Sequence, residues 1–287
     1  MMKAYLSLIK FSHTVFALPF AMIGAVLGFK DGYPLPVTLF FKIILCMIFA
    51  RSAAMAFNRW ADARFDVLNP RTAVREIPAG VISSRSAVLF VLVSCIAFVI
   101  TTFFINRICF YLSPVALLTI LGYSLTKRWT AICHLILGTG LALAPIGAYL
   151  AVTSHFSVIP LLFSGIVFYW VSGFDIIYSL QDEEFDKTHR LYSIPAKLGK
   201  SKALLVSRLL HVLCALLILF CSQLLASKYN SASILIWVSA AFFIGMLMYQ
   251  QSLVSPGDLS RINLAFFTIN GIASVIYGLL IGFDLLF

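Results

Sequence analysis

The composition of this chain excludes a soluble globular domain. Its 287 residues are 61% hydrophobic and 11% charged, and the mean hydropathy is +1.00, whereas a soluble domain carries roughly 25% charged residues. The formal net charge of +10 comes from basic residues in short loops between apolar runs, which argues against nucleic-acid binding and for attraction to anionic lipid. We therefore expect an integral membrane protein in a lipid bilayer.

Apolar runs that are long enough to cross a bilayer recur along the chain. A spanning helix needs about 20 apolar residues, and lipid requires every backbone amide to be bonded within the segment, so the spans should be helices. The sequence predicts an all-α fold of nine transmembrane helices in a single domain, 1–287, around a central cavity. The predicted spans are 12–29, 37–57, 87–105, 108–125, 131–152, 157–181, 203–225, 232–250 and 262–283.

The distribution of Lys and Arg predicts the orientation. The first span follows Lys3 and Lys10 and also fits a signal peptide, but many further spans follow, so we expect it to be retained. Basic residues gather at the N-terminus and in the loops after the second, fourth, sixth and eighth spans, and such loops are cytoplasmic. We expect a bacterial inner-membrane protein whose N-terminus and basic loops are cytoplasmic and whose C-terminus lies outside.

Cysteine and histidine residues show no metal-binding pattern. The six cysteines lie in or beside apolar runs without a C-x-x-C pair, so we expect small core residues and no disulfide framework. The histidines, at 13, 134, 155, 189 and 211, also lack metal-ligand spacing.

The same acidic spacing follows the second and the sixth span. The second span ends "AMAFNRWADARFD" and the sixth ends "GFDIIYSLQDEEFD"; each holds two Asp four residues apart, and the two pairs are 120 positions apart. Downstream, "EIPAG" at 76–80 resembles "SIPAKLG" at 193–199. The pattern indicates a parallel internal repeat with halves of about 12–128 and 131–250, followed by a ninth helix. Such repeats often place a binding site at their interface.

Each acidic pair lies on a predicted stripe along one helix face, because side chains three or four positions apart are neighbours. The stripes are Asn58, Asp62 and Asp66, and Asp175, Tyr178, Asp182 and Asp186. If the helix ends face each other, four Asp carboxylates meet at a cytoplasmic mouth, where Mg²⁺ held by carboxylates and substrate phosphates relieves their repulsion. The alternative is a solvated acidic loop, which we favour for Glu183 and Glu184 because they point off the stripe.

Basic residues flank this predicted mouth. "NPRTAVREIPAG" supplies Arg71 and Arg75, and "GYSLTKRWT" supplies Tyr123, Lys127 and Arg128. Arg binds phosphate by bidentate hydrogen bonds and Lys by a point charge. Anchoring of a cytoplasmic loop is the alternative for Lys127 and Arg128.

Two charged residues lie deeper, inside predicted spans, where a charge is costly and usually functional. Arg51 stands seven residues before Asn58, on the same stripe, and is a candidate ligand for a substrate carboxylate. Asp175 stands seven before Asp182 and is a candidate for orienting a hydroxyl or taking a proton. A structural ion pair between Arg51 and Asp175 is the alternative.

Taken together, these residues resemble the UbiA superfamily of intramembrane aromatic prenyltransferases, whose pattern is N-x-x-x-D-x-x-x-D after the second helix and D-x-x-x-D after the sixth. Here the motifs read "NRWADARFD" and "QDEEFD", and "FSHTVFALPFA", "YSLTKR" and "GFDIIYSLQD" are similar as well. "NPRTAVREIPAG" and "GFDIIYSLQDEEFDKTHRLYSIPAKLG" resemble 4-hydroxybenzoate polyprenyltransferases, and even more the related enzymes of the futalosine branch of menaquinone synthesis. Many members have an Asp where Arg59 stands, which puts the metal count of the first motif in question.

The resemblance implies a nine-helix fold around a cavity that opens to lipid, a polyprenyl diphosphate donor, Mg²⁺ and an aromatic acid acceptor, with a role in ubiquinone or menaquinone biosynthesis. It implies catalytic roles for Asp62, Asp175 and Asp182, metal binding by Asp62, Asp66, Asp182 and Asp186, and substrate contacts from Arg51, Asn58, Arg75, Tyr123, Lys127, Arg128 and Tyr178. Two alternatives stay open: a different acceptor, such as haem, chlorin or a glycerol phosphate, and a secondary transporter, which would carry its charged site near the membrane midplane.

Overall fold

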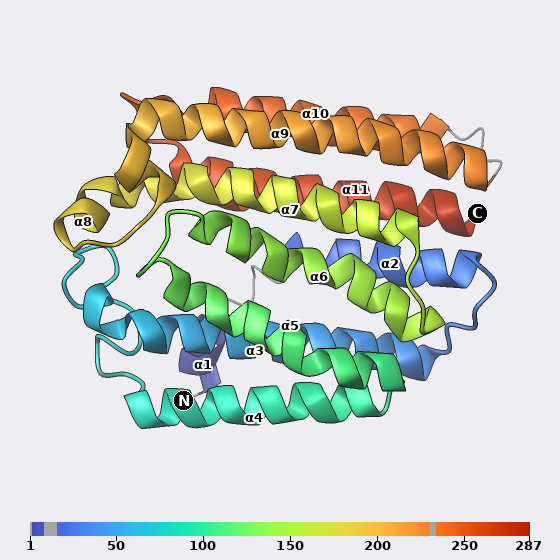
Figure 1. Cartoon of the computed structure of the whole chain (residues 1–287), viewed down its shortest axis with the longest axis horizontal. Coiled ribbons are helices and arrows are strands. Elements are labelled where there is room, and N and C mark those ends of the chain that lie inside the picture. Colours follow the sequence, from blue (N-terminus) through green and yellow to red (C-terminus); the bar gives the residue numbers. More distant parts are fainter. Residues whose placement is uncertain (1, 9–15, 230–233) are drawn as a thin grey trace.

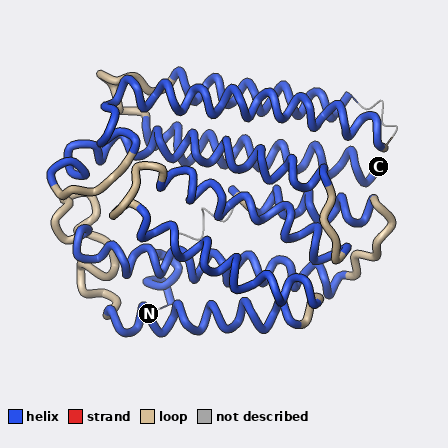
Figure 2. Tube along the Cα trace, in the orientation of Figure 1, coloured by secondary structure: helices blue, strands red, loops and turns tan. Residues whose placement is uncertain are grey.

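The structure is a computed structural model that describes residues 2–8, 16–229 and 234–287. Its elements in these ranges are helices, with no β-strand among them (Figure 2). They are α1 (Met2–Leu8), α2 (Leu18–Lys30), α3 (Val37–Asp66), α4 (Ser84–Phe103), α5 (Arg107–Thr126), α6 (Cys133–Thr153), α7 (Val158–Ser179), the 3₁₀ turn η2 (Leu180–Asp182), α8 (Glu183–Thr188), α9 (Ile194–Lys228), α10 (Ile234–Ser252), the π-helix η3 (Leu264–Ile269) and α11 (Asn270–Leu286).

The predicted all-α membrane fold is confirmed. Eight helical segments in the described part of the chain are long and apolar enough to cross a bilayer, and the shorter apolar helix α2 takes the place of the first predicted span. Positions 12–15 of that span lie outside the described residues. The second span is longer than predicted because α3 continues through the acidic motif to Asp66, and α1 was not predicted.

The long helices run side by side along the longest axis of the molecule (Figure 1). Helix α6 lies in the middle, where it packs against both α2 and α7. On one flank α3 packs against α4 and α5, and on the other α7 packs against α9 and α10 packs against α11. Helix α8 lies at one end of the molecule and the C-terminus at the other, so the acidic motifs at the ends of α3 and α7 share the α8 end.

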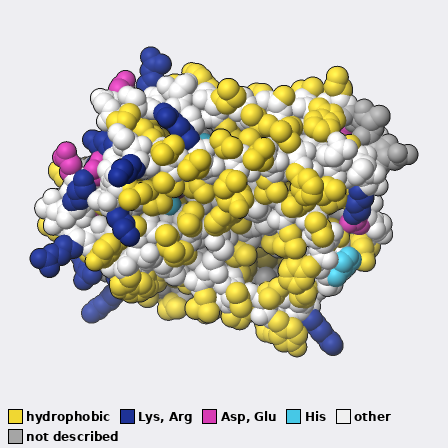
Figure 3. Space-filling model, turned by 45° about the horizontal axis from the view of Figure 1, so that its top comes forward, with side chains coloured by type: hydrophobic (Ala, Val, Ile, Leu, Met, Phe, Trp, Pro, Cys, Tyr) yellow, Lys and Arg dark blue, Asp and Glu magenta, His cyan; other side chains and the backbone are white. Residues whose placement is uncertain are grey.

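An aromatic core joins α2, α7, α10 and α11. Trp170 is fully buried, and its ring contacts those of Phe20 and Phe243, with centroids 5.5 and 5.4 Å apart. Its indole nitrogen donates to Asn270 Oδ1 at 3.0 Å, which satisfies the polar end of a buried ring. All six cysteines are free, as predicted. Hydrophobic side chains also cover the visible outer face between the two ends (Figure 3), as a lipid-facing surface requires.

The two acidic motifs stand on differently built helix ends. Helix α3 stays regular to Asp66, so the first predicted stripe lies on one helix. Helix α7 ends at Ser179, and the 3₁₀ turn over Leu180–Asp182 separates it from α8. The predicted stripe from Asp175 to Asp186 therefore crosses a 3₁₀ turn and does not lie on one regular α-helix. A 3₁₀ turn has three residues per turn instead of 3.6, which rotates the carboxylates beyond it relative to Asp175.

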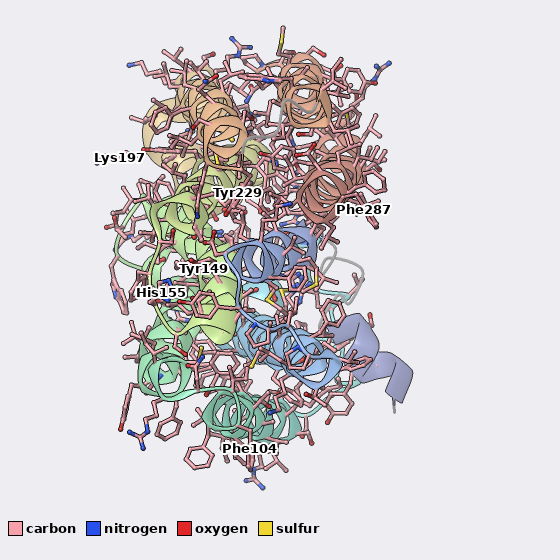
Figure 4. The ribbon with its side chains drawn as sticks, turned by 90° about the vertical axis from the view of Figure 1, so that its right-hand side faces the viewer. Phe104, Tyr149, His155, Lys197, Tyr229 and Phe287 are labelled. Carbon is pink, nitrogen blue, oxygen red and sulfur yellow. The ribbon has the colours of Figure 1, made fainter. Side chains whose placement is uncertain are left out.

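At the opposite end of the molecule, a cluster of hydrogen bonds centres on Asp31, just after α2. Lys228 Nζ lies 2.6 Å from Asp31 Oδ1, and the Tyr229 hydroxyl donates to the same oxygen at 2.8 Å. The Tyr149 hydroxyl donates to Oδ2 at 2.9 Å. Burial alone would raise the pKa of Asp31, but these three donors outweigh burial and lower it. The cluster ties α2, α6 and α9 together; Figure 4 looks onto this end, with Tyr149 and Tyr229 labelled.

Candidate active site

The first acidic motif occupies the last turns of α3. Asn58 donates from its side-chain amide to Asp62 Oδ2 at 3.2 Å. Arg75, from the loop after α3, donates from Nη1 to both carboxylate oxygens of Asp66, at 2.7 and 2.8 Å. Arg128, which follows α5, places Nη2 3.9 Å from Asp62 Oδ1. Each carboxylate of this motif therefore faces a guanidinium group.

The second acidic motif is held by the loop that follows the first one. Arg71 Nη2 lies 2.6 Å from Asp182 Oδ2 and 2.9 Å from Oδ1, and its Nη1 donates to the Tyr178 hydroxyl at 3.2 Å. Asn69 donates to Asp182 Oδ1 at 3.3 Å. Burial alone would lower the pKa of the Arg71 guanidinium, but the Asp182 carboxylate outweighs burial and raises it. This ion pair ties the loop after α3 to the end of α7.

Lys127, just after α5, connects the two motifs. Its Nζ lies 2.7 Å from Asp186 Oδ1, and the Ser193 hydroxyl donates to Asp186 Oδ2 at 2.8 Å. Lys127 also interacts electrostatically with Asp182 and Asp62. Burial would lower the pKa of its ammonium, yet the Asp186 ion pair and these further carboxylates raise it. Lys127 is therefore a fixed positive charge between carboxylates of both motifs.

The residues present fit Mg²⁺ that is shared with a diphosphate. The four predicted metal ligands, Asp62, Asp66, Asp182 and Asp186, each face a Lys or Arg. Among the described residues no three His, Cys, Asp or Glu side chains form a metal-binding group by themselves, so the carboxylates do not meet as one cluster. Mg²⁺ is usually held by one or two carboxylates together with substrate phosphates, and Arg and Lys bind phosphate oxygens. The donor set thus suits a metal–diphosphate complex better than a bare ion.

The two glutamates beside the second motif differ. Glu184 is exposed, in agreement with a solvated position, whereas Glu183 is only 8% exposed and pairs with Lys187 one turn later. The expectation that Glu183 is solvated is therefore wrong. The 3₁₀ turn before α8 rotates the start of this helix inward, which the spacing alone does not reveal.

An apolar cavity of about 370 Å³ lies among α3, α4, α5 and α6. Its lining positions extend along α5 from Cys109 to Tyr123, a rise of about 20 Å at 1.5 Å per residue. Arg51 is the charged side chain of the lining. No hydrogen bond or ion pair joins its guanidinium to another described residue, and its Nε is buried without a partner. Because an unpaired charge is costly in apolar surroundings, Arg51 marks a place for an anionic group.

Asp175 does not form the ion pair with Arg51 that the sequence left open. Its Oδ2 lies 2.7 Å from Nδ1 of His134, at the start of α6. Tyr123, which lines the cavity beside Arg51, interacts electrostatically with both Arg51 and Asp175, and with Asp62 of the first motif. Tyr123 therefore lies near the Arg51 guanidinium, the Asp175 carboxylate and the first acidic motif.

Sequence reasoning missed three parts of this site. Arg71 was named as flanking the mouth but not as a site residue, although the Asn-Pro-Arg turn that carries it directly follows the first motif. Ser193 could have been found from its place in "SIPAKLG", the counterpart of "EIPAG". His134 carries no spacing signal, because its partners Asp175 and Ile194 are distant in sequence.

Comparison with known proteins gives a consistent answer. The chain matches the UbiA prenyltransferase family over residues 17–272. The 4-hydroxybenzoate octaprenyltransferase of Aliivibrio salmonicida is 30% identical over 90% of this chain and 86% of its own length. That of Photobacterium profundum is 28% identical over 96% of this chain and 94% of its own.

Solved structures share the fold. A UbiA homologue from Aeropyrum pernix K1, in its apo structure, has a TM-score of 0.84 and 32% identity, over 95% of this chain and 98% of that one. A UbiA homologue from Archaeoglobus fulgidus bound to GPP and Mg²⁺ has a TM-score of 0.75 and 22% identity, over 98% of this chain and 99% of that one. With a family match over most of its length and the same helical architecture, the chain belongs to the UbiA prenyltransferase family.

Proposed function

We propose that this protein transfers a polyprenyl group from polyprenyl diphosphate to a hydroxylated aromatic carboxylic acid, 4-hydroxybenzoate or a dihydroxynaphthoate, in ubiquinone or menaquinone biosynthesis. The relatives named as 4-hydroxybenzoate octaprenyltransferases support this acceptor class. The observation that carries the proposal is the Arg51 guanidinium in an apolar cavity, which has no hydrogen-bond or ion-pair partner in the described chain and whose Nε is buried. It lies on the helix that bears the first acidic motif. A carboxylate is the natural anion for such a group.

The donor diphosphate binds at the α8 end, between the two acidic motifs. The four cations paired with the motif carboxylates, Arg71, Arg75, Lys127 and Arg128, would bind its phosphate oxygens. Asp62, Asp66, Asp182 and Asp186 would hold Mg²⁺, as the UbiA homologue bound to GPP and Mg²⁺ suggests for this fold. Asn58 orients Asp62, and Tyr178 keeps Arg71 in place. When bound, Mg²⁺ neutralises charge that develops on the leaving diphosphate.

The transfer itself needs positioning and protection from water. The allylic C–O bond breaks and its electron pair leaves with the diphosphate, where the fixed guanidinium and ammonium groups stabilise the growing charge. A ring carbon beside the acceptor hydroxyl then forms the C–C bond, and the proton on that carbon is lost. Burial of the reaction among the helices limits attack of water on the carbocation.

The acceptor and the prenyl tail occupy the apolar cavity. Arg51 binds the acceptor carboxylate, while Tyr123 and Asp175 lie near the ring. The lining between Cys109 and Tyr123 is apolar and long enough for part of a prenyl chain to extend along α5. The two halves of the predicted repeat then contribute one acidic motif each to the same substrate.

The cytoplasmic face of the inner membrane is the proposed location of the diphosphate site. Lys and Arg side chains gather at the α8 end of the visible face (Figure 3), and basic loops are retained in the cytoplasm. We infer that the N-terminus is cytoplasmic and that the Asp31 end faces outward.

The test is a product assay on membranes that contain this protein. Polyprenyl diphosphate and Mg²⁺ are supplied with either 4-hydroxybenzoate or a dihydroxynaphthoate, and the prenylated acid is detected by mass. We expect product with one acid, and loss of most activity in Asp62→Ala and Asp182→Ala, which remain folded. Product from a haem, chlorin or glycerol phosphate acceptor instead would overturn the acceptor assignment. Wild-type turnover by either variant would overturn the role of the motifs. Flux of an acceptor across proteoliposomes without product would favour a transporter.

A further inference from the structure

His134 is a buried histidine that has no role in the reaction proposed above. It lies in the first turn of α6 and its side chain is 4% exposed. Its Nδ1 is 2.7 Å from Asp175 Oδ2, and the backbone amide of Ile194 donates to its Nε2 at 3.4 Å. Both ring nitrogens therefore have partners from other parts of the chain.

These partners define the tautomer of the ring. A backbone N–H can only donate, so Nε2 is the acceptor nitrogen and the ring proton lies on Nδ1. From there it is donated to Asp175. A carboxylate that accepts such a bond is held in one orientation. His134 thus fixes the direction of the Asp175 side chain.

The other oxygen of this carboxylate is free for a ligand. Asp175 Oδ1 makes no hydrogen bond to another residue of the described chain, and the side chain is 21% exposed. Tyr123 interacts electrostatically with Asp175 and also with Arg51, the cation of the cavity. Because Tyr123 lines the cavity and interacts with both groups, Asp175 lies next to the cavity in which an aromatic acid would bind Arg51.

His134 also contacts the segment that supports the second acidic motif. Ile194, which binds its Nε2, follows Ser193 in the chain. Ser193 donates to Asp186 at 2.8 Å and caps the start of α9 through the amide of Ala196. The imidazole therefore touches both the loop that supports the second acidic motif and the deep carboxylate.

We propose that His134 is a positioning residue that aims Asp175 at the hydroxyl group of the aromatic acceptor, with Oδ1 accepting that hydrogen bond. This inference rests on the proposed function and adds the residue that sets the acceptor orientation. His134 touches no substrate and acts through Asp175. The geometry needs a donor at the position of Nδ1.

The test compares His134→Leu, which removes the donor, with His134→Asn, whose amide keeps an N–H near the position of Nδ1. We expect His134→Leu to lower kcat about 10–100-fold, as loss of a partner that orients a functional ligand commonly does. The KM for prenyl diphosphate should stay unchanged, and His134→Asn should recover most of the rate. In an Asp175→Asn background, His134→Leu should cause little further loss. If the two substitutions lower kcat independently, so that their losses multiply in the double variant, the proposal is overturned. It is also overturned if His134→Leu and His134→Asn lower kcat equally and both raise the KM for prenyl diphosphate.

A second readout is independent of turnover. ¹⁵N spectra of histidine-labelled protein in nanodiscs should show His134 protonated on Nδ1 and not on Nε2, and Asp175→Leu, which removes the acceptor, should shift the Nδ1 signal. A wild-type His134 protonated on Nε2 would overturn the positioning role. If the wild-type protein makes no prenylated acid at all, the proposed function fails, while these spectra still decide whether His134 orients Asp175.

Discussion

Charged side chains inside this protein divide into paired and unpaired groups. The four motif carboxylates have cationic partners at 2.6 to 3.9 Å, whereas Arg51 has none in the described chain. A paired charge can be explained by structure alone, because the partners compensate each other's desolvation. An unpaired guanidinium that lines an apolar cavity, as that of Arg51 does, is explained by a ligand. Arg51 is therefore the residue whose substitution distinguishes acceptor binding from structural support.

Arg51→Leu is expected to raise the KM for the aromatic acid about 10–100-fold, because a hydrogen bond to a charged group contributes roughly 1.5–3 kcal/mol. The KM for prenyl diphosphate should not change. Initial rates at varied concentrations of each substrate measure both constants. Lys42→Met is the matched control, since Lys42 lies on the same helix but bonds to the Phe104 carbonyl outside the cavity lining. A raised KM for prenyl diphosphate, or an unchanged KM for the aromatic acid, would contradict the assignment of Arg51 to the acceptor carboxylate.

At the scale of elements, the contact of α2 with α6 depends on glycine. A Cβ built on Gly24 overlaps the carbonyl of Pro145, a backbone group that cannot rotate away. Because α6 in turn packs against α7 and α5, this contact determines where the helices around the site lie. By contrast, Gly245 on α10 faces open space.

Gly24→Ala should therefore destabilise the protein by about 1–3 kcal/mol, the usual cost of overpacking. Thermal unfolding in detergent measures the effect. Gly245→Ala is the control, and there we expect no loss or a small gain, since Ala favours helix over Gly. Equal unfolding temperatures for both variants would show that α2 and α6 are not in this close contact.

The helices themselves were predictable, but not how they end. Long apolar runs must be helical in lipid, so the span prediction agrees with the structure. The 3₁₀ turn over Leu180–Asp182 was not predictable from spacing, because Asp175, Asp182 and Asp186 fit an α-helical stripe equally well. The ion-pair partner of each carboxylate could not be predicted either, since Arg71 and Asp182, for example, are 111 positions apart in the sequence. The acidic motifs and Arg51 could be recognised as candidate site residues from the sequence, because charged residues are rare in this chain.

At the scale of the whole molecule, the two ends carry different clusters of polar side chains. The α8 end gathers the acidic motifs and their cations, and the opposite end is tied by the Asp31 cluster, which joins α2, α6 and α9. The anionic form of Asp31 is the acceptor for all three donors. The contribution of this cluster to stability should therefore depend on pH.

Asp31→Asn is expected to lower the unfolding temperature at pH 7 and to matter less as the pH falls. The folded-state pKa of Asp31 lies below its ordinary value of 3.8, so the stabilisation is present above the unfolded-state pKa and is lost as the pH falls through the folded-state pKa. Thermal unfolding of both proteins between pH 7 and about pH 3 measures the difference. Glu184→Gln, which alters an exposed carboxylate, should follow the wild-type curve. A gap between Asp31→Asn and wild type that widens in acid would contradict the cluster.

We propose that the two acidic motifs and their cations form one metal–diphosphate site. The most direct measurement is equilibrium binding of a non-hydrolysable prenyl thiodiphosphate to the purified protein, with and without Mg²⁺. We predict binding that strengthens with Mg²⁺ in the wild type and in the control Glu184→Gln, and that weakens about 10–100-fold in Asp182→Asn at the same Mg²⁺ concentration. Binding that is equally tight without Mg²⁺, or unchanged in Asp182→Asn, would contradict the account.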